Sequence, residues 1–500
     1  MRTRLTISVL ALLICTYLLA ETYSGTCGNN LTWTLTEDSV LTISGTGEMD
    51  DYDWSRVPPW TDYYKQIKAL VVEDGVTTIG NEAFNSCCCP YLETAIIGND
   101  VFRIGDMAFS SAVKLKTITL GTNVMILGTN VFFGCNELTS INLPNSIGMI
   151  GGGAFTDCVS LTSVELPSNL IYLESCVFAN CENLVTIVLP ENLEGIGSNS
   201  FQGCETLASL TIPDKVTDIE SAAFIGCRNM RSITLPTSLK SLGYGVFCDC
   251  RSLDSITIPK STINIGDAVF LACDSLSSIV VEDGNPVYDS RDNCNAIIHT
   301  ATNTLHAGCR KTIIPASVNT IGSSAFQNIS TLKYINIPNN VSAVDKYAFS
   351  GTGISSVIFP NGITSLSEYV VGECLNLESI TIPASVTKVD WWVFANDYNL
   401  DTIICYSSTP PAITENTFEY FYNQQSCHLY VPSESIDLYK SSDGWKDFLN
   451  ILPIGIGIST PIENAALQKS KAKILHKGQI FILRGEKIYT VTGAEVQNIH

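Results

Sequence analysis

The hydrophobic and polar positions of this chain repeat every 23 residues, most regularly between Cys135 and Cys273. One period reads IGxxAFxxCxxLxxIxLPxxV. A period in the twenties predicts a solenoid, because one such unit cannot bury its apolar face without neighbours. The core should therefore consist of columns of equivalent side chains. The clearest column contains Phe132, Phe155, Phe178, Phe201, Phe224, Phe247 and Phe270.

Each period contains one clear strand signal. Val164 and Leu166 alternate with Ser163 and Glu165, which predicts a short strand with an apolar inner face and a polar outer face. Pro167 should end the strand because proline donates no ladder hydrogen bond. Glycine four residues before several of the phenylalanines suits a bend where a side chain would obstruct stacking or force an unfavourable φ, although other coils carry Glu there.

The string AFxxCxxLxxIxLP, over roughly residues 25–432, resembles the BspA-like leucine-rich repeat family of bacterial and some protist cell surfaces. The resemblance implies a β-rich (α/β-type) leucine-rich repeat solenoid of about fifteen coils. It implies a parallel sheet on one face and short helical or turn segments on the other. It also implies an adhesive role, with host matrix proteins or other bacteria as partners.

Residues 1–20 have the layout of a secretory signal peptide, with Arg2 and Arg4 before an apolar run that is too short to span a bilayer comfortably. We expect cleavage near Ala20 and an exported, soluble protein. Cys15 offers a lipoprotein alternative, but Ile14 precedes it where a small residue would be expected. No later segment has the apolar run of a transmembrane helix.

Residues 21–70 lack the repeat and are predicted to form an N-terminal cap over the open end of the core. Their aromatic residues favour cap packing, with a carbohydrate-stacking platform as the alternative. These residues are Tyr52, Trp54, Trp60, Tyr63 and Tyr64.

Residues 71–453 are predicted to form the solenoid, with its inner strand column beginning at Val72. The column jumps from Ile279 to Thr312, so we place a hairpin insert near residues 282–311 and expect it to protrude from the coil. Val371 later replaces the column phenylalanine, and a C-terminal cap is expected near residues 405–453.

Residues 454–462 resemble a linker, and residues 463–500 carry strand patterns at 480–483 and 488–491. This last segment resembles the C-terminal sorting domain of the type IX secretion route of Bacteroidetes bacteria. A small β-unit that merely ends the chain is the alternative. The resemblance implies attachment at the outer membrane surface.

The net charge is −21 although only 15% of residues are charged. Lys and Arg clusters for phosphate binding are missing from the sequence, which argues against nucleic acid as a partner. Such acidity mainly keeps an elongated particle soluble, and we expect a monomer.

Nineteen cysteines in an exported chain suggest disulfides, but seven of them follow the column phenylalanines by three residues. A buried column position suits cysteine as a small hydrophobe, and parallel side chains on stacked coils meet the disulfide dihedral poorly. We predict free thiols there, and the spacing does not fit a zinc site. The state of Cys87, Cys88 and Cys89 stays open, and Cys294 could bridge Cys309 across the insert.

The sequence contains no catalytic signature among GxSxG, HExxH and phosphate-loop motifs, and its carboxylates are scattered. His299 and His306 could face each other across the hairpin, either as a metal pair or as exposed side chains. We therefore predict a non-enzymatic binding protein without a cofactor or a bound metal.

Two surfaces are candidates for ligand binding. The outer strand positions form a ladder of hydroxyls that either serves a glycan or extended protein ligand or simply suits β-structure; its candidate residues are Ser209, Thr211, Ser232 and Thr234. Aromatic residues just before the core column in three late coils form the second surface: Tyr347, Tyr369, Trp391 and Trp392. Two-residue alternation from Phe394 predicts that Trp392 points inward and Trp391 outward.

These features favour a surface-displayed adhesin that recognises host matrix proteins or other cells. Capture of glycans for nutrient uptake is the alternative, and a structural role in the cell envelope is a third.

Overall fold

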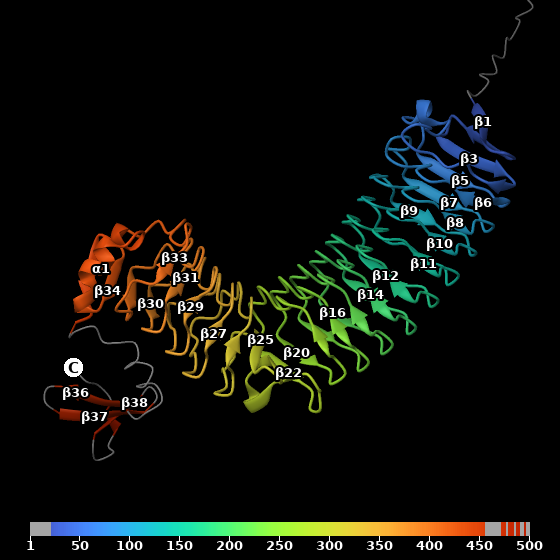
Figure 1. Cartoon of the computed structure of the whole chain (residues 1–500). Coiled ribbons are helices and arrows are strands. Elements are labelled where there is room, and N and C mark those ends of the chain that lie inside the picture. The colour runs from blue at the N-terminus through green and yellow to red at the C-terminus, as the bar shows by residue number, and fades with distance from the viewer. Residues whose placement is uncertain (1–21, 456–471, 477–478, 485–486, 491–494, 497–500) are drawn as a thin grey trace, which may run out of the picture.

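The computed structural model describes residues 22–455 and, in the tail, residues 472–476, 479–484, 487–490 and 495–496. Residues 22–455 form a parallel β-solenoid of about 17 turns with about 23 residues in each (Figure 1). Parallel strand pairing extends beyond the predicted columns at both ends of the solenoid. There β3 (Val40–Gly45) pairs in parallel with β5 (Ala69–Val72), and β35 (Asn450–Pro453) pairs in parallel with β34 (His428–Val431).

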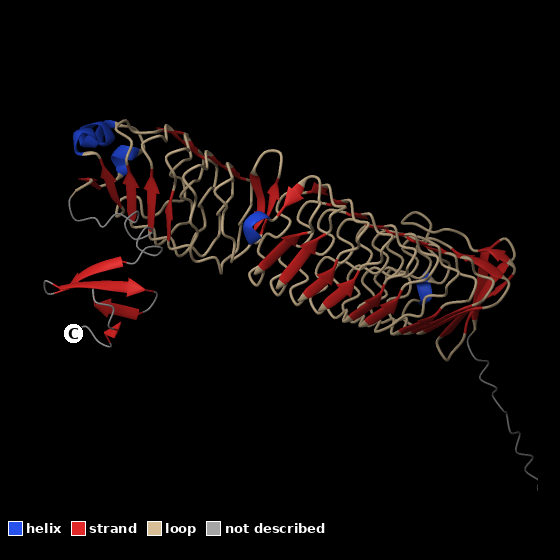
Figure 2. Cartoon of the chain, turned by 90° about the horizontal axis from the view of Figure 1, so that it is seen from below, coloured by secondary structure: helices blue, strands red, loops and turns tan. Residues whose placement is uncertain are grey.

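One row of strands is the row predicted from the LxxIxLP segment, and Figure 2 shows it from below. Strands of adjacent coils pair in parallel in short runs, several of them only two strands long, so Leu210 lies opposite Ile233, each between exposed flanking residues. At the N-terminal end the partner of Ala95 is Leu70, not Val72 as the column predicted. The other strands of this row are β7 (Thr94–Ile97), β9 (Thr117–Thr119), β12 (Ser163–Glu165), β14 (Thr186–Val188), β16 (Ser209–Thr211), β18 (Ser232–Thr234), β20 (Ser255–Ile258), β22 (Ser278–Val281), β28 (Ser356–Ile358), β30 (Ser379–Ile382) and β32 (Thr402–Cys405).

A second row of very short parallel strands was not predicted. Most of them place one apolar residue in the core, as Leu173 and Ile196 do in adjacent coils, and a strand of two residues is too short to give a readable alternation. The second face is thus mainly short strands and turns, not helices. Its strands are β4 (Gly47–Glu48), β6 (Val76–Ile79), β8 (Arg103–Ile104), β10 (Ile126–Leu127), β11 (Met149–Ile150), β13 (Tyr172–Leu173), β15 (Gly195–Ile196), β17 (Asp218–Ile219), β19 (Ser241–Leu242), β21 (Asn264–Ile265), β26 (Thr320–Ile321), β27 (Ala343–Val344), β29 (Ser365–Leu366), β31 (Lys388–Val389) and β33 (Ala412–Ile413).

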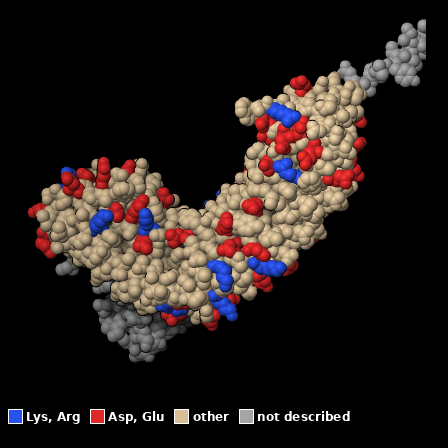
Figure 3. Space-filling model, turned by 45° about the vertical axis from the view of Figure 1, so that its right-hand side comes forward, with Lys and Arg blue, Asp and Glu red and all other residues tan. Residues whose placement is uncertain are grey.

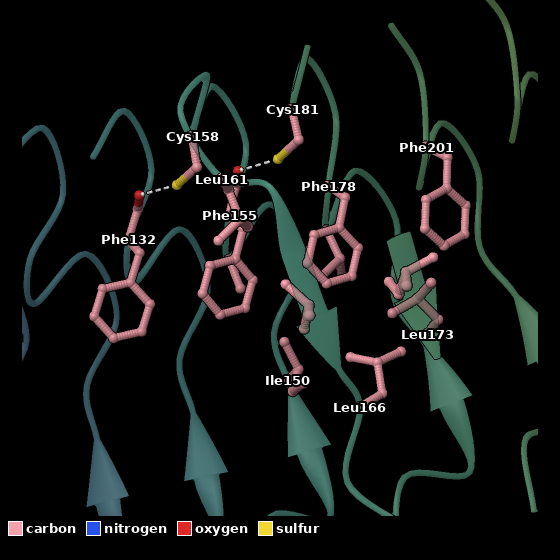
Figure 4. Close-up of a cluster of buried hydrophobic side chains, with 14 of the residues drawn as sticks. Phe132, Ile150, Phe155, Cys158, Leu161, Leu166, Leu173, Phe178, Cys181 and Phe201 are labelled. Carbon is pink, nitrogen blue, oxygen red and sulfur yellow. Dashed lines mark hydrogen bonds between the residues drawn. The ribbon is translucent and has the colours of Figure 1, made fainter. Parts of the chain in front are cut away.

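The third side of each coil is a turn that holds the phenylalanine column. From Phe84 to Phe270 the buried rings stack with centroids 5.2–5.9 Å apart. Figure 4 shows the part of this column from Phe132 to Phe201. Trp60 stacks on Phe84 at 5.1 Å and closes this column at the N-terminal end. The cap there also contains β1 (Tyr23–Gly28), β2 (Leu31–Leu35) and a 3-10 turn at Thr61–Tyr63, whereas Trp54 is 92% exposed.

The column cysteines hydrogen-bond between coils. The thiol of Cys181 donates to the Phe155 carbonyl at 3.1 Å, and the same contact recurs from Cys135 to Cys273 at 3.1–3.3 Å (Figure 4). Burial raises the pKa of the Cys158 thiol to about 12. The Phe155 carbonyl also accepts from the Cys158 nitrogen at 3.1 Å, so the cysteine thiol adds a second donor from the next coil, which is a more specific role than that of a small hydrophobe.

The glycines before the phenylalanines permit close stacking. A Cβ on Gly197 would lie 2.8 Å from the carbonyl carbon of Glu174, and one on Gly266 would lie 2.5 Å from the Tyr244 nitrogen. Neither glycine has a positive φ. The requirement is therefore the absence of a side chain against the previous coil, and not an unusual backbone conformation.

The insert forms a hairpin of β24 (Ala296–His299) and β25 (Thr304–Gly308), preceded by β23 (Tyr288–Asp289) and a 3-10 turn at Arg291–Asn293. It does not protrude as predicted, because Ile297, Ile298 and Leu305 are fully buried and β25 pairs in parallel with β26. The alternating pattern described the strands well but could not reveal which sheet they would join.

The insert thickens only one side of the solenoid. On the turn side the Ala272 nitrogen donates to the Gln327 carbonyl at 3.1 Å, so these turns stack directly. On the side of the second strand row, by contrast, the three strands β23, β24 and β25 come between β21 and β26. The two halves of the solenoid accordingly meet at an angle at this segment (Figure 1), and the hydrophobic core is divided there into two clusters.

The C-terminal end is covered by the short helix α1 (Ile436–Ser441) and by 3-10 turns at Ser433–Ser435 and Trp445–Asp447. The tail strands form an antiparallel sheet in the order β36 (Ala472–His476), β37 (Gln479–Arg484), β38 (Lys487–Thr490) and β39 (Glu495–Val496). The first tail strand was not predicted. In the described ranges no helix has the length and apolar character needed to cross a bilayer. The predicted signal peptide and most of the predicted linker lie outside the described residues.

Candidate binding surface

The hydroxyl ladder lies on the outer face of the first strand row, as predicted. Ser209 pairs in register with Ser232, Thr211 pairs with Thr234, and all four side chains are exposed. Within the described solenoid no side-chain hydrogen bond joins these hydroxyls. Their hydrogen-bonding capacity is therefore directed to solvent, and they do not support one another across the strands.

The late-coil aromatic residues come together into one row. The Tyr347 and Tyr369 rings stack with centroids 5.3 Å apart, and Trp392 continues the row 5.6 Å from Tyr369. Trp391 lies edge-on to Trp392 at 5.8 Å. We call these four residues the aromatic row. The first three side chains are half-buried, and Trp391 is 46% exposed.

An unusual backbone conformation positions three of these rings. Tyr347, Tyr369 and Trp392 have φ of 59°, 51° and 54°, in the left-handed region that bulky residues rarely adopt. The same column position is left-handed in the earlier coils, where it holds mostly small or turn-forming residues such as Asn130, Gly153, Asn199, Ala222, Gly245 and Ala268. Large aromatic residues at this position cost about 1–2 kcal/mol each in backbone strain.

This conformation overturns the predicted inward orientation of Trp392. The segment before Phe394 is a turn, so the two-residue alternation of an extended strand does not apply. The indole nitrogen of Trp392 donates to Glu419 Oε2 at 2.8 Å, near the surface. Both tryptophans therefore belong to the surface, whereas Val393 and Phe394 enter the core.

The aromatic row ends at an open hollow of about 540 Å³ on the C-terminal cap. The link is direct, because Trp392 contacts two residues of its lining: its backbone nitrogen donates to Asn416 at 3.2 Å, and its indole donates to Glu419. The lining has four carboxylates and no Lys or Arg. It consists of Ile413, Thr414, Glu415, Asn416, Phe418, Glu419, Gln424, Asp443, Gly444 and Asp447.

Carboxylates also flank the row itself. The Tyr347 hydroxyl donates to Glu368 at 3.0 Å, and burial together with this contact raises the pKa of Tyr347 to about 12. Burial and the nearby charge of Glu373 raise the pKa of Tyr369 as well. The row therefore lies in a negative electrostatic environment.

The acidic residues of the hollow were not predicted from the sequence. Glu415, Glu419, Asp443 and Asp447 come from two segments of an irregular cap that has no repeat columns, so their meeting could not be inferred. The signal that was present is the acidic stretch around Phe418, which follows directly on the coil that carries Trp391 and Trp392.

The two hairpin histidines have separate partners. His299 Nδ1 lies 2.9 Å from the Thr302 hydroxyl, and His306 Nε2 lies 3.1 Å from the Gly266 carbonyl. Over the part of the chain that the structure describes, no group of three or more His, Cys, Asp or Glu side chains is arranged to hold a metal ion.

Charge is unevenly spread over the surface. Figure 3 shows uncharged side chains over most of this face, with charged side chains in separate groups at both ends and along the middle of the solenoid. The large uncharged area agrees with a composition in which only 15% of residues are charged.

Comparisons with known structures agree with the solenoid. A leucine-rich repeat protein from Bacteroides ovatus is 22% identical, with a TM-score of 0.50 over 86% of this chain and 99% of that one. A leucine rich cell surface protein from Faecalibacterium prausnitzii is 21% identical, with a TM-score of 0.44 over 87% and 96%. A comparison with curated proteins finds no match.

Sequence family membership is more specific. Six copies of the BspA type leucine rich repeat region match residues 62–185, 175–294 and 305–425. These ranges include most of the solenoid and leave out the N-terminal cap strands and the tail. The protein belongs to the BspA type leucine-rich repeat family.

Proposed function

We propose that this protein is exported, displayed on the cell surface and used as a non-enzymatic adhesin that binds host matrix proteins or other cells. Its repeat family supports a protein-binding role. The extended solenoid offers a long, preformed surface whose ordering costs little on binding. The tail at residues 463–500 serves as the type IX sorting segment in this proposal.

The observation that carries the proposal is the aromatic row at a left-handed column position. Strained backbone conformations persist where the surrounding structure enforces them, and they gather at functional sites. Replacing Asn or Gly by Tyr or Trp at this position adds strain and half-exposed aromatic area in three coils of the same array. Aromatic residues in such surroundings dominate the binding energy of protein interfaces.

The test is a capture assay with the tagged full chain against immobilised matrix proteins, intact bacterial cells and mucin. We expect capture of a protein or cell ligand that falls at least about tenfold in Trp391→Ala. Tyr244→Ala is the matched control, because Tyr244 occupies the equivalent position in an interior coil and is 59% exposed. Capture of mucin glycans alone would favour the nutrient-uptake alternative, and no capture at all would favour a structural role in the envelope.

A further inference from the structure

The aromatic row and the hollow beside it form one continuous surface. The Trp392 indole donates to Glu419 at 2.8 Å, and Glu419 lines the hollow. A ligand lying along the row would therefore reach the hollow without crossing a break. The extent of the surface, four rings followed by about 540 Å³, fits an extended segment better than a single small molecule.

The charges around this surface define the chemistry of the occupant. Glu415, Glu419, Asp443 and Asp447 line the hollow, and Glu368 and Glu373 flank the tyrosines. Two of these carboxylates have cationic neighbours: Asp443 pairs with Lys446 at 2.6 Å, and Glu368 lies 3.8 Å from Lys346. The other four have no salt-bridge partner within the described residues, so the surface has an excess of negative charge.

Aromatic rings and carboxylates favour the same ligand group. A Lys or Arg side chain is attracted to the face of an indole or phenol ring and to a nearby carboxylate, and each contact is stronger when partly desolvated. The net charge of −21 would also speed the approach of a positively charged partner. A neutral glycan could stack on the rings but would gain little from so many carboxylates.

We propose that the aromatic row and its adjoining hollow bind a basic, extended segment of a partner protein, with Lys or Arg side chains over the rings and in the hollow. This inference rests on the proposed function, since it names the partner chemistry of the same surface. It assigns Trp391 and Trp392 to ring contacts, and Glu415 and Glu419 to charge contacts.

The probe is a capped peptide of alternating Lys and Gly, with alternating Gln and Gly as the neutral control, titrated into the full chain. We expect saturable binding of the Lys peptide only. Glu415→Gln with Glu419→Gln should weaken it about tenfold or more, because the amides keep the size and a hydrogen-bond acceptor for Trp392 but remove the charge. Glu165→Gln, an exposed change on the first strand row, should leave the affinity unchanged.

Trp391→Ala should also weaken the Lys peptide about tenfold while Tyr244→Ala does not, with thermal melting used to verify that each variant is folded. Equal affinity in all variants would overturn the proposal, because binding would then reflect net charge alone. No binding of the Lys peptide would overturn it as well. If the parent still captures a protein, cell or glycan through Trp391, only the basic occupant is wrong; if it captures none of these, the proposed function fails too.

Discussion

The Cys158 thiol donates to the Phe132 carbonyl, 26 residues earlier in the chain, at 3.1 Å. This contact joins two coils through a group that lies inside the core, where water cannot replace it. The Phe132 carbonyl also accepts from the Cys135 nitrogen at 3.1 Å, so the thiol is its second donor, and such a hydrogen bond contributes about 0.5–1.5 kcal/mol. The cysteine column is therefore a repeated hydrogen-bond bridge along the turn side of the solenoid.

The first prediction concerns this column. Cys204→Ala should lower the free energy of unfolding by about 0.5–1.5 kcal/mol, because the Phe178 carbonyl loses its second donor and keeps only the Cys181 nitrogen at 3.2 Å. Cys87→Ala, at an exposed cysteine, should change it by less than about 0.5 kcal/mol. Urea denaturation measures both. Equal effects would show that the thiol hydrogen bond contributes nothing.

A related prediction concerns the redox state of these cysteines. At pH 8 a maleimide should label Cys87 quickly in the native protein and leave the column cysteines unlabelled, because burial raises the pKa of their thiols. After denaturation without reductant, the seven column thiols should all label. Mass spectrometry counts the adducts, and fewer than three free column thiols would contradict the prediction.

The third prediction concerns Asp397, which lies three residues after Phe394 and so occupies the position that cysteine holds in most of the earlier coils. Burial raises the pKa of this carboxyl well above 3.8, and although its Oδ1 accepts from the Cys374 nitrogen at 2.8 Å, its Oδ2 has no partner. Above pH 3.8 the unfolded chain releases this proton while the folded chain retains it, so rising pH favours unfolding up to the folded pKa. Asp397→Asn should remove this dependence.

The free energy of unfolding of Asp397→Asn should be similar to that of the parent near pH 3. As pH rises toward the pKa of Asp397 in the folded protein, the variant should become the more stable of the two, by up to about 1.4 kcal/mol per pH unit. Urea denaturation at a series of pH values measures the difference. The exposed Asp214→Asn serves as the control for the loss of one negative charge. A constant difference between Asp397→Asn and the parent from pH 3 to 7 would mean that this carboxyl does not titrate abnormally.

The fourth prediction separates strain from packing at Trp392. Trp392→Gly loses the bond to Glu419 and the ring contacts, but it relieves about 1–2 kcal/mol of left-handed strain. The melting temperature should therefore change little, and ligand capture should fall. A decrease of about 3–5 kcal/mol in the free energy of unfolding, typical of truncating a large core side chain, would instead support the inward orientation predicted from the sequence.

The fifth prediction concerns the tail. Deleting residues 463–500 should leave the unfolding transition of the solenoid unchanged, since the sequence of the tail contributes no member to the 23-residue repeat columns. The deletion should abolish surface display in a host with type IX secretion, measured by antibody labelling of intact cells. Unchanged labelling would refute the sorting assignment.

The repeat columns could be predicted because every coil places equivalent residues in equivalent surroundings, so Phe178 or Leu210 is supported by many similar neighbours. Features that occur once could not be predicted in this way. The direction of Trp392 depends on a local φ that its own residue type disfavours. Glu419 and Asp443 meet in the hollow through a cap that has no sequence repeat. The burial of β25 depends on the pairing of Leu305 with Ile321, which the sequence of the insert alone does not specify.

The 23-residue columns also bear on how such a gene can change. Because Phe201 contacts the rings of its two neighbours in the same way that Phe224 does, losing or duplicating one whole coil between Cys135 and Cys273 would recreate the same contacts at the new junction. The hairpin at Ala296–Gly308 interrupts this equivalence, since its strands have no counterpart in other coils. Unequal recombination can therefore lengthen or shorten the N-terminal half while the aromatic row stays at its fixed distance from the C-terminal cap.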